Sequence, residues 1–496
     1  MTGDKLKIAF VSSEVVPFAK TGGLADVAGA LPKVLSKLGH EVKVILPKYK
    51  MIDEKKFNLK SKKIELNPIP INEKQVKLEV KSAKLEDSEV EWLFLKNDFY
   101  YHRDELYRDN KTGQDYADND ERFILFARGT LEMLKQLNWQ PDIIHCNDWQ
   151  SGLIPAYLKT VYRNDSFFEK TGCLYSIHNL AYQGNFPAEV FNKLGLDRNL
   201  FYPMGPFEYW SKLSFMKAGI FYADIINTVS PTYALEIQSG SEYGYGLEGI
   251  LSSRKSDLFG IINGIDYAIW NPGVDQFIPY NYDPKNLSGK EKNKQQLLKQ
   301  NELPQGKGRT PLIGIISRLA DQKGFDLIAQ ISARLLSLDL KIVILGTGDK
   351  KYHELFDNMQ KKFPDKIKVN LAFNDKLAHL IEAGSDMFLM PSRYEPCGLN
   401  QLYSLKYGTV PIVRKTGGLA DTIQDYDPTT GKGNGFVFDN YDAEKLLETI
   451  QRAVNLYKNE KLWTRLMLSG MEQDFSWKAS ATKYMELYQR ALSRKW

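Results

Sequence analysis

Residues 20–26 read KTGGLAD, and residues 415–421 repeat the same run, KTGGLAD. Each copy follows an apolar, β-branched run and precedes a stretch with helical spacing. Paired glycines at a strand-to-helix turn let backbone N–H groups approach a ligand closely, and the following helix N-terminus favours an anion. A single turn of this kind more often serves packing. Its presence in each half predicts two nucleotide-binding folds that present related turns toward a shared cleft.

Short β-branched runs alternate with longer amphipathic stretches along the whole chain, a pattern typical of βαβ units and parallel sheets. Strands are predicted at 8–12, 41–46, 142–145, 174–177 and 225–229, and the pattern restarts at 312–316, 341–345, 387–390 and 409–413. We therefore expect an α/β protein with two sheets. Between residues 58 and 94, polar and apolar residues alternate, which predicts an antiparallel excursion from the first sheet.

The length of 496 residues favours two domains. The segment 258–284 is rich in glycine and proline and predicts the crossing between them. We place the first domain at residues 1–256 and the second at residues 257–476. Residues 477–496 form an amphipathic helix that must dock on a domain, with one apolar face made of Ala481, Tyr484, Leu487, Tyr488 and Leu492.

The composition excludes several classes of protein. With 43% hydrophobic and 26% charged residues the chain is ordinary for a globular protein, and no run approaches the apolar length of a membrane span. Because the first predicted strand begins close to Met1, we expect no signal or transit peptide. A net charge of +5, from 66 basic and 61 acidic residues, is too diffuse to indicate nucleic-acid binding. The widely spaced Cys146, Cys173 and Cys397 suggest neither disulfides nor a zinc knuckle, and we expect a reducing cytoplasm.

Two cations follow the strand predicted at 312–316. Residues 317–324 read SRLADQKG, so Arg318 and Lys323 stand at the carboxyl end of that strand. Open α/β sheets bind ligands at this edge, and the two charges suit a diphosphate. An isolated arginine or lysine would more often be a surface charge.

An acidic residue follows the strand predicted at 387–390. Residues 391–400 read PSRYEPCGLN and run into an apolar helix. Glu395 can accept hydrogen bonds from sugar hydroxyls, while the helix N-terminus behind it can receive phosphate oxygens. Taken alone, a carboxylate that opens a helix explains Glu395 equally well.

Seven blocks, taken in order, closely resemble the glycogen/starch synthases of bacteria and plastids over the whole chain. They are 20–24 (KTGGL), 176–184 (SIHNLAYQG), 244–249 (GYGLEG), 262–266 (INGID), 270–272 (WNP), Arg318 with Lys323, and 395–399 (EPCGL). The resemblance implies the GT-B fold, in which two Rossmann-like domains face each other across a deep cleft. It also implies an acceptor-side first domain, onto which the helix 477–496 packs back, and a second domain that binds the nucleotide sugar.

The same resemblance assigns roles to single residues. Arg318 and Lys323 would hold the diphosphate, and His178 would lie beside the anomeric carbon. Asp148 would contact donor or acceptor hydroxyls, and Glu395 would grip the glucose. These five residues are the expected catalytic set. The expected donor-binding residues are Lys20, Gly22, Gly23, Arg318, Lys323, Cys397, Gly398, Leu399, Thr416 and Gly417, and the expected acceptor-binding residues are Asp148 and Tyr182. For His178 alone a core histidine would be the commoner reading, but its place after a strand and before NLAYQ favours function.

The resemblance implies a cytoplasmic glycosyltransferase that moves glucose from ADP-glucose to the non-reducing 4-hydroxyl end of an α-1,4-glucan, with retention of configuration. Elongation of glycogen or starch is the expected activity, and the choice of ADP over UDP rests on the resemblance alone. We expect no metal and no cofactor, because the cations already supply the charge that Mg²⁺ provides elsewhere. The diffuse charge and the lack of a long apolar run predict no nucleic-acid or membrane partner. The oligomeric state is left open. Catalysis would require both halves of the chain, since each carries part of the set.

Two positions depart from the family pattern. Gln150 stands where many relatives carry a histidine, so it receives no catalytic role. Tyr403 stands eight residues after Glu395, where the wider superfamily often carries a second glutamate. A mechanism that needs two carboxylates in that loop is therefore excluded.

Three other functions fit the sequence less well. An NAD-dependent dehydrogenase is disfavoured, because the nearest fingerprint, GTGDKK at 346–351, has a lysine where the third glycine belongs. A glucan phosphorylase shares the broad architecture, but this chain is short for that family and lacks its recognisable pyridoxal-lysine segment. A non-catalytic glucan-binding protein is disfavoured because Lys20 and the residues of the catalytic set are present.

Overall fold

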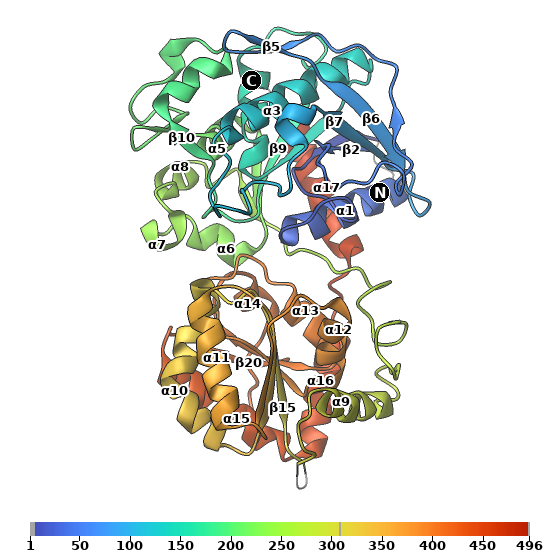
Figure 1. Ribbon diagram of the computed structural model, residues 1–496, viewed down its shortest axis with the longest axis vertical. Coiled ribbons are helices and arrows are strands. Elements are labelled where there is room, and N and C mark those ends of the chain that lie inside the picture. Colours follow the sequence, from blue (N-terminus) through green and yellow to red (C-terminus); the bar gives the residue numbers. More distant parts are fainter. Residues whose placement is uncertain (1–4, 307–308, 495–496) are drawn as a thin grey trace. The chain divides into compact units, whose positions relative to one another are not determined.

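The computed structural model describes residues 5–306 and 309–494, and the chain divides into two compact units (Figure 1). Unit 1 comprises Met1–Val229, Ala234–Gly264 and Trp477–Trp496, and unit 2 comprises Ser230–Tyr233 and Ile265–Ser476. The main division thus follows Gly264 and not residue 256. The reason is that β14 (Leu258–Gly260) pairs in parallel with β13 (Ile225–Thr228) and so extends the sheet of unit 1.

In the described residues, unit 1 is built on a nine-stranded sheet with the order β14-β13-β9-β8-β1-β2-β7-β6-β3. Its other strands are β1 (Lys7–Val11), β2 (Glu41–Pro47), β3 (Lys60–Ser61), β6 (Glu79–Lys84), β7 (Glu91–Lys96), β8 (Ile143–Asn147) and β9 (Gly172–Ile177). From β7 to β14 all pairs are parallel, whereas β6 pairs antiparallel with β7 and β3. The antiparallel excursion predicted between residues 58 and 94 is thereby confirmed.

Two smaller sheets complete the strands of unit 1. One is the hairpin of β4 (Ile69–Ile71) and β5 (Lys74–Val76), and the other joins β10 (Asn185–Pro187), β12 (Lys212–Ser214) and β11 (Glu208–Tyr209). The helices up to residue 253 are α1 (Gly23–Lys37), α2 (Asp98–Tyr101), α3 (Asn119–Gln136), α4 (Leu153–Lys159), α5 (Phe215–Tyr222), α6 (Pro231–Glu236), α7 (Ser241–Gly244) and α8 (Glu248–Ser253). Short 3-10 helices are η1 (Trp149–Ser151), η2 (Ala188–Leu194) and η3 (Arg198–Leu200).

The last helix, α17 (Trp477–Ser493), belongs to unit 1 and is red in Figure 1. Its buried face includes Ala481, Tyr484, Leu487 and Tyr488. The Tyr488 hydroxyl lies 2.9 Å from His145 Nδ1 in β8. The docked tyrosines therefore combine apolar burial with a hydrogen bond at the polar tip, as buried tyrosines require.

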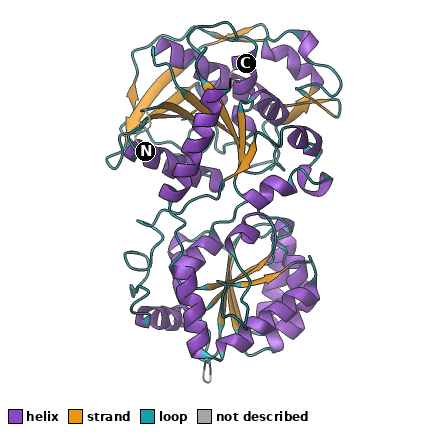
Figure 2. Cartoon of the chain, turned by 180° about the vertical axis from the view of Figure 1, so that it is seen from behind, coloured by secondary structure: helices purple, strands orange, loops and turns teal. Residues whose placement is uncertain are grey.

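In the described residues, unit 2 is built on a six-stranded sheet in which every pair is parallel, with the order β17-β16-β15-β18-β19-β20. Its strands are β15 (Leu312–Ile316), β16 (Lys341–Leu345), β17 (Ile367–Asn370), β18 (Met387–Met390), β19 (Val410–Arg414) and β20 (Phe436–Phe438). Its helices are α9 (Ser288–Gln300), η4 (Asp321–Lys323), α10 (Phe325–Ser337), α11 (Lys350–Lys362), α12 (Asp375–Gly384), α13 (Asn400–Lys406), α14 (Gly417–Thr422), α15 (Ala443–Tyr457) and α16 (Glu460–Met471). Figure 2 shows these helices on both faces of the sheet.

Alternate residues of the strands in unit 2 other than β17 enter two separate hydrophobic cores. In β15, Ile313 and Ile315 face one core, and Leu312 faces the other. A parallel sheet covered on both faces needs apolar residues in both directions, which explains the continuous apolar runs in the sequence. The predicted α/β class with parallel sheets is confirmed.

The strand order fixes where a ligand can bind in each unit. Taken in chain order, the strands of unit 2 run 3-2-1-4-5-6, which is the Rossmann order. The central strands of unit 1 follow the same rule, since β1 lies between β2 and β8. Ligands of such sheets bind outside the carboxyl ends of the strands where the order reverses. These switch points are β1/β8 in unit 1 and β15/β18 in unit 2.

All three cysteines are buried thiols. In the part of the chain that the structure describes, no helix combines the length and the apolar character needed to cross a membrane.

Candidate functional site

The loop after β1 carries the first KTGG motif, and a buried carboxylate holds it in place. Glu14 Oε2 accepts hydrogen bonds from the backbone N–H groups of Thr21 (2.6 Å) and Gly22 (3.0 Å), and Oε1 accepts one from the Thr21 hydroxyl (2.5 Å). Lys20 remains partly exposed, with Nζ 2.8 Å from Asp26. Glu14 therefore fixes the loop that presents Lys20, a role that the sequence analysis missed.

Gly22 leaves its backbone open to a ligand. Its φ of −148° is accessible to any residue, and a Cβ added there would meet no atom within 4 Å. Neither backbone strain nor packing therefore explains a glycine here. Its lack of a side chain instead keeps the N-terminus of α1 accessible, as the predicted contact with the donor requires.

Tyr107 holds the Glu14 carboxylate through a hydrogen bond. Its hydroxyl lies 2.9 Å from Glu14 Oε1 and 2.7 Å from Ser13 Oγ. Because the carboxylate can only accept, the Tyr107 hydroxyl donates to Glu14 and accepts from Ser13. The Tyr107 carbonyl in turn accepts from Asn119 Nδ2 at the start of α3 (2.9 Å).

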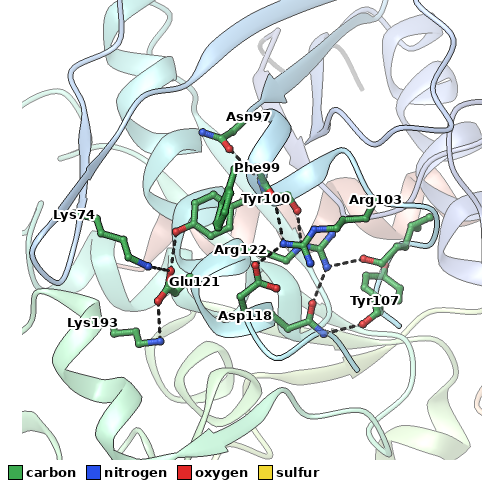
Figure 3. A network of polar contacts seen from close by, with 12 residues as sticks. Lys74, Asn97, Phe99, Tyr100, Arg103, Tyr107, Asp118, Glu121, Arg122 and Lys193 are labelled. Carbon is green, nitrogen blue, oxygen red and sulfur yellow. Dashed lines mark hydrogen bonds and ion pairs between the residues drawn. The ribbon is translucent and has the colours of Figure 1, made fainter. Parts of the chain in front are cut away.

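Figure 3 shows the buried network to which Tyr107 belongs. At its centre, the fully buried Arg122 donates to the carbonyls of Tyr100 (2.7 Å) and Leu106 (2.8 Å). Glu121 receives the ammonium groups of Lys74 (2.8 Å) and Lys193 (2.9 Å). Arg122 Nη2 is buried without a hydrogen-bond partner among the described residues, but Arg122 Nη1 also donates to Asn119 Oδ1 at 2.6 Å, so several bonds hold the start of α3 in place. The N-terminus of α3 is thus a firm base for the Lys20 loop.

Asp148 follows β8, at the other side of the switch point of unit 1. Its backbone has φ 52° and ψ −176°, a region in which non-glycine residues are strained by about 1–3 kcal/mol. Its Oδ1 accepts the backbone N–H of His178 at 2.7 Å. Desolvation raises the pKa of Asp148 to about 7, and the backbone donors of His178 and Asn179 oppose this rise. Strain and a shifted pKa at a switch point are typical of functional residues.

His178 follows β9, the strand next to β8, and its ring is held in one tautomer. Nε2 lies 2.9 Å from Asn147 Oδ1, and Asn147 Nδ2 donates to the Val11 carbonyl at 3.0 Å, which turns Oδ1 toward the ring. An amide oxygen only accepts, so Nε2 carries the proton. Desolvation lowers the pKa of His178 to about 4. The imidazole is therefore neutral at pH 7, with Nδ1 available as an acceptor.

The segment that follows His178 leads to Tyr182, whose ring is exposed as an acceptor-binding residue would be. Gly184, with φ 61°, approaches Trp149 so closely that an added Cβ would lie 2.4 Å from the indole. The aromatic contacts of Trp149 with Phe123 and Phe186 therefore anchor both the Asp148 loop and the His178 segment. Gln150 is buried, and we assign it no chemistry.

In unit 2 the loops after β15 and β18 meet at the switch point. Lys323 Nζ lies 2.7 Å from Glu395 Oε2, and the Ser392 hydroxyl donates to the same oxygen at 2.9 Å. Gly324, with φ 75°, makes this approach possible, since a Cβ there would lie 1.9 Å from the Pro391 carbonyl. Glu395 is only 6% exposed, so a paired cation is what such a carboxylate needs.

Arg318 stands at the same edge but apart from this pair. Its side chain is exposed, and its guanidinium lies 3.5 Å from Gln322 Oε1. The segment that follows β16 holds the Arg318 loop in place. The Leu319 N–H donates to the Thr347 carbonyl at 2.9 Å, and a Cβ at Gly348 would lie 2.3 Å from the Leu319 carbonyl. The GTG run at 346–348 thus serves to support the Arg318 loop.

The second KTGG copy packs against the Glu395 loop. A Cβ at Gly417, which has φ 44°, would lie 2.0 Å from the Glu395 carbonyl, and one at Gly418 would lie 2.0 Å from the Cys397 carbonyl. The Gly418 N–H donates to the Glu395 carbonyl at 3.1 Å. Here the paired glycines are required by packing, unlike Gly22 in the first copy. Thr416 and Cys397 are buried, and Gly398 and Leu399 lie partly exposed before α13. Gly23, the other donor residue expected in unit 1, is the first residue of α1.

Each unit therefore gathers its predicted residues at its own switch point. Unit 1 holds Lys20, Asp148 and His178, and unit 2 holds Arg318, Lys323 and Glu395. The roles of these residues remain predictions. Within residues 5–306 and 309–494, no group of three or more His, Cys, Asp or Glu side chains is placed to hold a metal ion. Chemically, unit 1 offers a neutral imidazole and an acid with a pKa near neutrality, and unit 2 offers two cations and a carboxylate.

Two family models match the chain. Residues 7–253 match the model described as the starch synthase catalytic domain, and residues 295–465 match glycosyl transferases group 1. Among curated relatives, a glycogen synthase of Desulforudis audaxviator is 48% identical, with 99% of this chain and 97% of that protein covered. A glycogen synthase of Thermotoga maritima is 45% identical, with 99% of each covered.

Among solved structures, a starch synthase is also similar to this chain. The catalytic domain of Starch Synthase IV from Arabidopsis thaliana, bound to ADP and acarbose, is 35% identical with a TM-score of 0.89, and the match covers 99% of this chain and all of that one. Sucrose-phosphate synthase from Thermosynechococcus elongatus is 15% identical with a TM-score of 0.60, over 98% of this chain and 99% of that one. The second match shows a shared fold only.

Proposed function

Because this chain belongs to the glycogen/starch synthase family of glycosyltransferases, we propose that it transfers glucose from ADP-glucose to the non-reducing 4-hydroxyl end of an α-1,4-glucan. Configuration at the anomeric carbon is retained, and the glucan grows by one unit. The donor identity draws support from the ADP in the Arabidopsis structure, and the acceptor from its acarbose and from the glycogen synthases among the relatives.

The observation that supports this function most is the ion pair between Lys323 and Glu395 at the switch point of unit 2. When the bond between C1 and the β-phosphate breaks, negative charge develops on the leaving diphosphate and positive charge on the sugar. Lys323 and Arg318 stabilise the negative charge on the diphosphate. Glu395 accepts hydrogen bonds from the glucose hydroxyls once the diphosphate competes for the Lys323 ammonium.

His178 and Asp148 act on the sugar side. The neutral imidazole of His178 leaves Nδ1 as an acceptor for a sugar hydroxyl, because Asn147 occupies Nε2. Asp148 positions the His178 backbone through its Oδ1 and contacts hydroxyls of the donor or the acceptor. Tyr182 offers an exposed ring to the glucan.

Retention proceeds by attack of the glucan 4-hydroxyl on the face that the diphosphate leaves. The new bond forms between C1 and the glucan oxygen, and the proton of the 4-hydroxyl passes to the departing phosphate. A covalent glycosyl-enzyme path would need a carboxylate on the opposite face of the ring. Eight residues after Glu395 stands Tyr403, whose ring stacks on Trp270 with 3.9 Å between centroids.

We also propose that the reaction needs no metal ion, since Arg318 and Lys323 carry the charge-stabilising role. The protein would work in the cytoplasm, a compartment that suits its three buried thiols.

Incorporation of labelled glucose into glycogen tests this function. ADP-glucose should label the glycogen more efficiently than UDP-glucose, EDTA should leave the rate unchanged, and β-amylase should release the label as maltose. A preference for UDP-glucose would refute the proposed donor, and loss of activity with EDTA would refute metal independence. Label that resists β-amylase would refute the α-1,4 linkage.

A further inference from the structure

A strained hairpin in unit 1 holds a tryptophan out toward solvent. Tyr209 of β11 pairs with Lys212 of β12, so Trp210 and Ser211 alone form the turn. Both have positive φ, 48° and 61°, the type I′ geometry that favours Asn-Gly and strains bulky side chains. Trp210 is nevertheless 77% exposed. The backbone of this turn is therefore strained, although the Trp210 ring contributes little to the hydrophobic core.

The tip of this hairpin is held firmly. Glu208 Oε1 accepts the Ser211 N–H at 2.7 Å, and Oε2 accepts the Met204 N–H at 2.9 Å. Lys217 Nζ donates to the Glu208 carbonyl at 2.6 Å. Met204, itself at φ 63°, is 90% exposed. The loop therefore presents apolar groups on a fixed backbone.

The hairpin is joined to the segment that carries His178 and Tyr182. The Tyr209 hydroxyl donates to the Tyr245 carbonyl at 2.5 Å, and Gln183 Nε2 donates to the same oxygen at 3.0 Å. Gly246 follows Tyr245, and a Cβ there would lie 3.0 Å from Trp210 Nε1. The GYGLEG motif at 244–249 thus lies beside the indole and links the hairpin to the segment of the predicted acceptor residues.

Strained residues that persist at fixed sites point to a function. An exposed indole on a hydrogen-bonded turn offers a flat apolar face with a polar N–H at its edge. The ring of a glucose unit has a matching apolar face of C–H groups and a rim of hydroxyls, and an α-1,4-glucan repeats that face along its length. We propose that Trp210 is an acceptor-binding residue, which stacks on a glucose unit of the glucan behind the reacting end. This inference rests on the proposed function.

Trp210→Gly separates this role from a structural one. Glycine suits both the positive φ and the type I′ turn, so the variant should keep or raise the melting temperature. Its KM for maltoheptaose should rise about tenfold, which corresponds to 1.4 kcal/mol, while the KM for ADP-glucose stays unchanged. Maltose is too short to span both sites, so its kinetics should not change. Trp210→Phe, which keeps a ring, should retain most of the affinity.

Phe99→Ala is the matched control, because Phe99 is an exposed aromatic residue of unit 1 at 70% and should leave both KM values unchanged. A KM for maltoheptaose in Trp210→Gly equal to that of the wild type would overturn the inference. A change in the oligomeric state of the Trp210→Gly protein, measured by light scattering, would also overturn it, because Trp210 would then serve a protein contact. If the wild type transfers no glucose from ADP-glucose, the proposed function fails separately. Calorimetric titration with maltoheptaose then decides, and equal affinity of wild type and Trp210→Gly would overturn the inference.

Discussion

Lys323 and Glu395 lie 72 positions apart in the chain, yet Nζ of one is 2.7 Å from Oε2 of the other. The loops after β15 and β18 meet at the switch point of unit 2, and each brings one charge. The pair keeps both charges neutralised in the absence of substrate. A diphosphate that recruits the ammonium would free the carboxylate for glucose, so under the proposed function this contact would couple diphosphate binding to glucose binding.

Loss of either cation should slow catalysis. Lys323→Ala and Arg318→Ala should each reduce kcat on the order of 10²-fold or more, the scale for one preorganised charge stabiliser at a transition state. Steady-state kinetics with saturating glycogen measures the effect. Lys361→Ala, which removes an exposed lysine of α11, is the control and should behave as wild type. Near-normal kcat in either variant would remove that residue from the diphosphate site.

Glu395→Gln tests whether Glu395 positions the sugar or takes part in bond breaking. Glu395→Gln keeps the volume and the capacity to accept one hydrogen bond, but it loses the ion pair with Lys323. We expect a drop in kcat on the order of 10-fold, because sugar positioning is weakened while the charge on the diphosphate is still met. A near-total loss would contradict positioning and would place the carboxylate in the bond-breaking step itself.

Asp148 should make stability depend on pH in a defined direction. Its pKa is raised to about 7, whereas an unfolded aspartate ionises near pH 4. Between these values the folded state binds the extra proton, so the free energy of unfolding falls as pH rises, by at most about 1.4 kcal/mol per unit. Asp148→Asn lacks this term and should gain stability relative to wild type from pH 5 to pH 7.

Chemical denaturation at both pH values checks this prediction. His178, with a pKa of about 4, gives the opposite slope between pH 4 and pH 6.5, because the unfolded state then binds the proton. That contribution is present in both proteins and cancels in their difference. An equal difference in stability at pH 5 and pH 7 would show that Asp148 ionises normally in the folded state.

Glu14 should matter although it is not expected to contact the substrate. Glu14→Gln leaves some of the donors from Thr21, Gly22 and Tyr107 without an acceptor, which loosens the Lys20 loop. We expect the KM for ADP-glucose to rise about tenfold or more. Tyr107→Phe removes one of these hydrogen bonds and should change KM in the same direction by less. Unchanged KM in both variants would show that the loop needs no such support.

The strands could be predicted from the sequence because parallel strands buried on both faces are continuous apolar runs. Every strand predicted by residue range lies within two residues of an observed one. The turn at Trp210 and Ser211 had no such signal, since neither residue belongs to the Asn-Gly class that marks a type I′ hairpin. The domain boundary was placed too early because β14 is short and lies in a glycine-rich stretch.

The chemistry-bearing residues could be found in part. Arg318, Lys323 and Glu395 each follow a predicted strand, which makes them candidates, and only the family resemblance assigns them roles. Their pairing is a long-range contact that no local pattern contains. Glu14 also follows a strand, but a carboxylate that binds backbone N–H groups has the same sequence signature as one that binds a ligand. Likewise, the two KTGG copies are identical in sequence, yet only the structure separates the open Gly22 from the tightly packed Gly417.

Release of ADP from ADP-glucose, measured with and without glycogen, tests the central proposal most directly. We predict rapid ADP release that requires glycogen and matches, mole for mole, the glucose added to it. The same assay on Lys323→Ala should show a rate lower on the order of 10²-fold. Release of ADP that does not respond to glycogen, or no release with glycogen present, would contradict the account of this protein as a glucan-elongating glucosyltransferase.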